Sequence, residues 1–78
     1  MTDEQIREEK LKMWKKNLKQ LEDELKALYI KKGQAAQEGD LRENAAYQMA
    51  IEDAETWRVR IDEVKQIISK LENGGDEK

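Results

Sequence analysis

Apolar side chains recur at alternating steps of three and four residues in two long segments of the chain. This spacing places them on one stripe of an α-helix, the a and d positions of a heptad repeat. It holds without a skip in either segment and predicts two long helices, at about residues 3–38 and 40–72. The first stripe is Leu11, Trp14, Leu18, Leu21, Leu25 and Leu28, and the second is Tyr47, Ala50, Ala54, Trp57, Ile61, Val64, Ile68 and Leu71.

The two stripes match when the second is read backwards. Pairing them in order, from Leu11 with Ile68 to Leu28 with Ala50, gives residue numbers that add to 78 or 79 in every layer. A constant sum is what an antiparallel hairpin with a turn near Gly39 requires, and large residues then face small ones. The predicted fold is all-α, a long antiparallel two-helix coiled-coil hairpin whose arms are each about 50 Å long.

Composition restricts the chemistry that the chain can perform. Its 78 residues include no Cys and no His, which excludes disulfides, thiolate nucleophiles, imidazole bases and the commonest zinc ligands. A bound metal would be a hard cation held by carboxylates, such as magnesium. The net charge of -3 argues against wholesale nucleic-acid binding. No apolar run approaches the roughly 20 residues of a membrane span, so we expect a soluble, cytoplasmic protein.

The turn between the stripes has the sequence EGDLRENAAY and carries two acids, Asp40 and Glu43. Gly39 can adopt the left-handed conformation that follows a helix, and Asp40 is a good N-cap for the second helix. Glu43 then stands where the acid of a capping box belongs. The turn nevertheless contains more polar groups than a turn needs, including Glu38 and Arg42. Two interpretations therefore stay open, a helix cap and an acidic tip directed at another molecule.

This string resembles the coiled-coil tip of bacterial Gre-type transcript cleavage factors, in which Gly-Asp-Leu-basic-Glu-Asn-Ala-x-Tyr joins two long antiparallel helices. The resemblance implies an accessory factor, not an enzyme, that enters the secondary channel of a backtracked RNA polymerase. It implies that Asp40 and Glu43 help to hold a magnesium ion of the polymerase and to orient the attacking water near the RNA 3′ end. Asn44 and Tyr47 match neighbouring family positions and are expected to help shape the site. No tightly bound cofactor is expected.

The chain also departs from that family. Gre-type factors carry a second, globular C-terminal domain, whereas here residues 1–73 are interpreted as one hairpin, with a tip at 38–44, and residues 73–78 as a disordered tail. The resemblance therefore implies either promotion of transcript cleavage or, without that domain, its modulation or inhibition. The family position that is often acidic before the tyrosine is occupied by Ala46.

Three further points are left open by the sequence. The lysine-rich first segment either faces RNA or is a solvated face that pairs with the acidic second segment. Gly33 is either a weak point of its helix or a place where another surface approaches closely. The rival function is a structural or adaptor coiled coil that dimerises or binds a partner helix, although we expect a monomer. A free-standing hydrolase ranks far behind both, because the sequence offers no plausible base, nucleophile or pocket.

Overall fold

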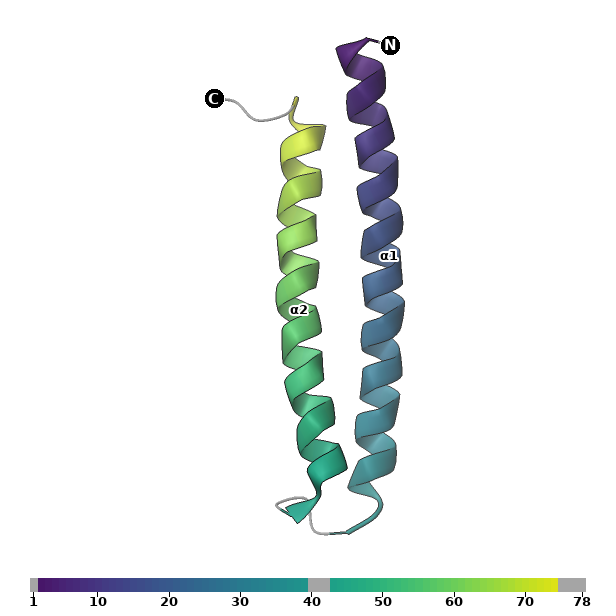
Figure 1. The fold of residues 1–78 in the computed structure, drawn as a ribbon, viewed down its shortest axis with the longest axis vertical. Coiled ribbons are helices and arrows are strands. Elements are labelled where there is room, and N and C mark those ends of the chain that lie inside the picture. Colours follow the sequence, from purple (N-terminus) through teal and green to yellow (C-terminus); the bar gives the residue numbers. More distant parts are fainter. Residues whose placement is uncertain (1, 40–42, 75–78) are drawn as a thin grey trace.

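The computed structural model describes residues 2–39 and 43–74. Two helices, α1 (Asp3–Ala36) and α2 (Ala45–Glu72), run antiparallel and lie side by side along their length (Figure 1). The Cα atoms extend over 57 × 21 × 13 Å, so the molecule is a narrow rod. The predicted all-α two-helix hairpin is confirmed. Neither helix is apolar enough over a sufficient length to cross a membrane, within the part of the chain that the structure describes.

The outer ends of the rod have well-formed caps. Thr2 caps α1 with a capping box, because its hydroxyl accepts from the Gln5 backbone N–H and the Gln5 side chain accepts from the Thr2 N–H. At the other end Asn73 caps α2, and Gly74 follows with a φ of 94°. These two residues belong to the helix cap and not to the tail that was expected to begin at 73; residues 75–78 lie outside the described part.

The inner ends of both helices differ from the prediction. The first helix ends at Ala36 instead of about 38, and Gln37 is its C-cap. The second helix begins at Ala45, five residues later than expected. Gly39 has a φ of 139°, in the region that favours glycine, as predicted for the turn.

Contacts between the helices agree with the predicted register. The Lys32 Nζ lies 5.9 Å from the centroid of the Tyr47 ring, so Tyr47 is opposite Lys32 as the pairing of the stripes requires. Farther along the rod, the indole N–H of Trp57 donates to a carboxylate oxygen of Glu24 over 2.8 Å. The residue numbers of these two contacts add to 79 and 81, close to the sums of the paired stripes, which agrees with the predicted register between the tip and the middle of the hairpin.

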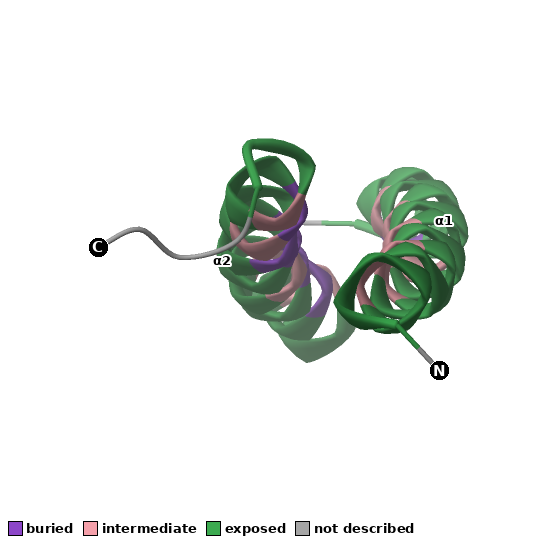
Figure 2. Cartoon of the chain, turned by 90° about the horizontal axis from the view of Figure 1, so that it is seen from above, coloured by how far each residue is buried: buried purple, intermediate pink, exposed green. Residues whose placement is uncertain are grey.

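The core is thin and is filled unequally by the two helices. The buried positions of α2 lie on the side that faces α1, while the facing positions of α1 are mostly half-buried (Figure 2). Alanines are among the best-buried residues: Ala54 is 1% exposed, Ala50 6% and Ala35 7%. Small side chains at these layers let the helix backbones approach closely near the tip. No polar side chain is buried among the described residues.

Gly33 lies in the last turns of α1 and is exposed. A Cβ atom added to it would meet nothing within 4 Å, so no part of the described chain requires a glycine there. The close approach that the sequence left open is therefore not made by the hairpin itself. Within this fold Gly33 weakens α1.

Gly33→Ala is expected to raise the free energy of unfolding by about 1 kcal/mol, because alanine loses less backbone entropy in a helix. Gly39→Ala is the matched control. Its Cβ would also meet nothing, but its φ of 139° is strained for alanine, so the free energy of unfolding is expected to fall by about 1 kcal/mol. Urea titrations followed by far-UV circular dichroism give both values. Equal effects of the two substitutions would contradict this assignment.

Candidate functional site

Asn44 joins the two helices at the tip of the rod. Its side-chain oxygen accepts a hydrogen bond from the Tyr47 backbone N–H over 3.1 Å, which makes Asn44 the N-cap of α2. Its side-chain nitrogen donates to the carbonyl oxygen of Ala35 over 2.6 Å, in the last turn of α1. One amide therefore satisfies an unpaired N–H at the start of one helix and contacts a terminal carbonyl of the other.

The capping box that the sequence suggested for Asp40 and Glu43 does not begin α2, whose N-cap is Asn44; Asp40 itself lies outside the described residues. Glu43 precedes the N-cap of α2, so it cannot be the third residue of a capping box, and that position is held by Tyr47. The prediction favoured the acids because Asp40 and Glu43 have the spacing of a capping box, whereas Asn44 lacks an acid three residues later. Two signals pointed to Asn44: asparagine caps helices as well as aspartate does, and the apolar stripe of α2 begins three residues after it.

The charged groups of the tip that the structure describes are exposed. Glu38 and Glu43 both face solvent, on either side of the turn. Asp40 and Arg42 lie outside the described residues, so the geometry of the Asp40–Glu43 pair is not established. Within residues 2–39 and 43–74, no group of three or more acids forms a cluster that could hold a metal ion. The exposed carboxylate of Glu43 is a hard oxygen ligand of the type that magnesium accepts, but the described tip is no metal cage.

Tyr47 packs within the hairpin. It is half-buried, and the ammonium group of Lys32 lies near its ring at cation–π distance. Its backbone N–H is held by Asn44. No hydrogen bond of its hydroxyl group to another described residue is present. The ring therefore contributes to the packing of the hairpin, whereas the described part of the hairpin does not require the hydroxyl group.

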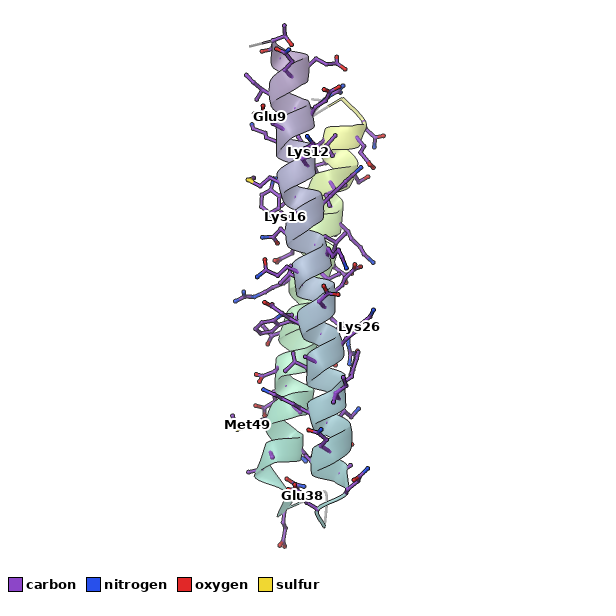
Figure 3. All side chains as sticks on the ribbon, turned by 90° about the vertical axis from the view of Figure 1, so that its right-hand side faces the viewer. Glu9, Lys12, Lys16, Lys26, Glu38 and Met49 are labelled. Atoms are coloured by element: carbon purple, nitrogen blue, oxygen red, sulfur yellow. The ribbon has the colours of Figure 1, made fainter. Side chains whose placement is uncertain are left out.

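The lysines of α1 form a largely solvated face. In Figure 3, Lys12, Lys16 and Lys26 lie on α1, the helix nearer the viewer, and all three are exposed. Between described residues, one ion pair crosses the hairpin, from Lys15 to Glu72 over 3.2 Å. Pairing with the acidic second helix, which the sequence suggested, is thus limited to one exposed pair of little energetic weight.

Glu38 and Met49 mark the tip end of the rod in Figure 3. Met49 is 61% exposed and was not singled out by the sequence, because it lies outside the apolar stripe of α2. Glu38, Glu43, Asn44 and Tyr47 thus all lie at the end of the rod where the chain passes from α1 to α2.

Comparison with known proteins gives one result. The family model described as "Transcription elongation factor, N-terminal", which represents GreA and GreB, matches residues 4–72. No curated protein and no solved structure gives a significant match to the chain. The matched segment includes both helices and the tip.

Tyr47→Phe is expected to change the free energy of unfolding by less than about 0.5 kcal/mol, because the ring and its contact with Lys32 remain. Tyr47→Ala removes the half-buried ring and is expected to cost about 1–2 kcal/mol. Thermal and urea unfolding of both variants measure these values. A loss in Tyr47→Phe as large as that in Tyr47→Ala would show that the hydroxyl group, and not the ring, stabilises the tip.

Proposed function

The chain belongs to the family of N-terminal domains of Gre-type transcription elongation factors, and we propose that it inserts its acidic tip into the secondary channel of bacterial RNA polymerase. There it acts on the hydrolytic cleavage of backtracked transcripts. The family is one of accessory domains, so the reaction takes place in the active site of the polymerase. The protein then acts in the cytoplasm, as a monomer, with the tip close to the RNA 3′ end.

One observation carries this proposal: Asn44 caps α2, and the carboxylate of Glu43 is left exposed at the end of the rod. Capping was the simplest explanation for the acids of the tip, and the structure assigns that task to a neutral side chain. Glu43 forms no hydrogen bond or ion pair with another described residue. The exposed carboxylate is therefore not used by the described part of the fold and is accessible to another molecule.

The shape of the hairpin supports the same function. A rod whose Cα atoms extend over 57 × 21 × 13 Å can carry a side chain deep into a narrow channel. The exposed lysines Lys12, Lys16 and Lys26 lie along α1 on the outer side of Lys32, away from the tip residue Tyr47, so the lysines and the acidic tip can meet different parts of a partner.

The residues present at the tip fit a magnesium ion supplied by the polymerase. Asp40 and Glu43 would provide carboxylate oxygens, the ligands that magnesium prefers. When bound, magnesium lowers the pKa of water and stabilises the charge that develops on the phosphate. Two carboxylates are too few to hold the ion without further ligands, so we expect the free chain to bind magnesium weakly. Asn44 directly follows Glu43 in the chain, and we expect Asn44 and Tyr47 to help shape the site.

The rival function, an adaptor that dimerises, finds less support. Large apolar side chains are exposed at several positions, but these are scattered over different sides of both helices: Ile6, Met13, Tyr29, Ile30, Met49 and Val59. Single exposed apolar residues are normal on soluble proteins and form no continuous face for a partner helix. Sedimentation equilibrium tests the rival directly, since a stable dimer that buries the tip is incompatible with channel entry.

The proposed function is tested with backtracked elongation complexes incubated with the chain and magnesium. The parent chain is expected to change the rate of transcript cleavage. The double substitution Asp40→Asn with Glu43→Gln is expected to reduce that change at least about tenfold, because two metal ligands are lost. Gel separation of the released RNA fragments measures the rate.

Asp62→Asn combined with Glu63→Gln is the matched control. It removes the same two charges from exposed positions of α2 far from the tip, and it is expected to behave as the parent does. A parent chain that neither alters cleavage nor competes with a full-length Gre factor for polymerase would refute the proposal.

A further inference from the structure

Asn44 makes both of its hydrogen bonds where the chain passes from one helix to the other. The Ala35 carbonyl oxygen accepts from the Asn44 side chain over 2.6 Å and from the Glu38 backbone N–H over 3.1 Å. Its two lone pairs are thereby used. The same Asn44 side chain accepts from the Tyr47 N–H. The last turn of α1, the Glu38 backbone and the first turn of α2 are thus linked through one carbonyl and one amide.

This arrangement needs an amide side chain. A primary amide carries a donor and an acceptor on separate atoms, so it can serve Ala35 and Tyr47 at once. Aspartate would keep the acceptor but present a carboxylate oxygen to the Ala35 carbonyl, with no donor when ionised. Serine caps a helix equally well, but its hydroxyl is one bond shorter and does not span both partners. Asn44 is half-buried beside the buried Ala35, so water competes little for these bonds.

We propose that Asn44 is a positioning residue for Glu43, the exposed acid that immediately precedes it. The two hydrogen bonds fix the backbone of Asn44 to both helices, and Glu43 is attached directly to that fixed point. This inference rests on the proposed function of Glu43 at the tip. A group that must reach a reacting centre tolerates little misplacement, and an error of about 1 Å can cost about a hundredfold in rate. The two hydrogen bonds of the Asn44 side chain therefore position the carboxylate of Glu43 and also stabilise the hairpin.

The test distinguishes the hydrogen bond between Asn44 and Ala35 from the N-cap hydrogen bond between Asn44 and Tyr47. Asn44→Ser keeps an N-cap and loses the bond to Ala35, and Asn44→Asp keeps the cap and replaces the donor by an acceptor. Asn17→Ser, at an exposed position in the middle of α1, is the control for the exchange of residue type. For each full-length variant, circular dichroism gives the helix content and ¹⁵N relaxation gives the backbone order parameter at Glu43. Cleavage of backtracked complexes is then measured across a magnesium titration.

In the parent and in Asn17→Ser, the order parameter at Glu43 is expected near the rigid value of about 0.85. In Asn44→Ser and Asn44→Asp it is expected to fall below about 0.6, with helix content unchanged. The effect of the chain on cleavage is expected to fall about tenfold or more in both variants, and the half-maximal effect to need more magnesium, while competition for polymerase is retained. A residue that merely stabilises the fold would not shift the magnesium dependence at constant helix content.

Unchanged order at Glu43 in both Asn44 variants would overturn the inference and leave Asn44 as a simple cap. If the order parameter at Glu43 falls but cleavage and its magnesium dependence stay unchanged, the inference is overturned too. The hydrogen bonds of Asn44 would then not position the acid for the reaction. The two proposals fail separately. A parent chain without effect on transcripts refutes the proposed function, while the order parameters still decide whether Asn44 holds Glu43 in place.

Discussion

The packing of one apolar stripe against the other is the interaction on which the whole molecule depends. Among residues 2–39 and 43–74, each helix packs only against the other. The stripe is not uniform, because its layers near the tip are filled by alanines such as Ala50 and Ala54. Small layers bring the backbones together, and a close approach allows a side chain of α2's N-cap to reach a carbonyl of α1. The bridge at the tip is therefore a consequence of the stripe's composition as much as of Asn44 itself.

The sequence was sufficient for the fold because the fold is determined by periodicity. Heptad spacing defines which side of each helix is apolar, and the matching of large and small layers defines the register, as the position of Tyr47 opposite Lys32 confirms. The inner helix ends could not be obtained in this way. The stripe gives no information between Leu28 and Tyr47, where alanines replace the leucines, so local rules alone had to place the start of α2.

Local capping rules ranked the wrong residue first for a physical reason. They score each candidate by hydrogen bonds within its own helix, and on that basis Asp40 with Glu43 is a better match than Asn44. The bond from Asn44 to Ala35 is a tertiary contact between residues nine apart, and it has no local signature. The same limit applies to the site. The string identified the tip, but only the structure distinguished the residue that caps α2, Asn44, from the exposed acid beside it, Glu43.

That separation has a physical advantage for a tip that is to act on a metal-dependent reaction. A carboxylate that caps a helix is stabilised by the helix dipole and by backbone N–H groups, typically by 0.3–1 kcal/mol or more. Drawing it away to a cation would require the loss of that stabilisation and would loosen the helix start. A neutral amide at the cap removes this conflict, because the hairpin keeps its end while the acid beside it remains solvated. The partial positive charge at the start of α2 still favours a carboxylate nearby, although no hydrogen bond of the described helix holds Glu43.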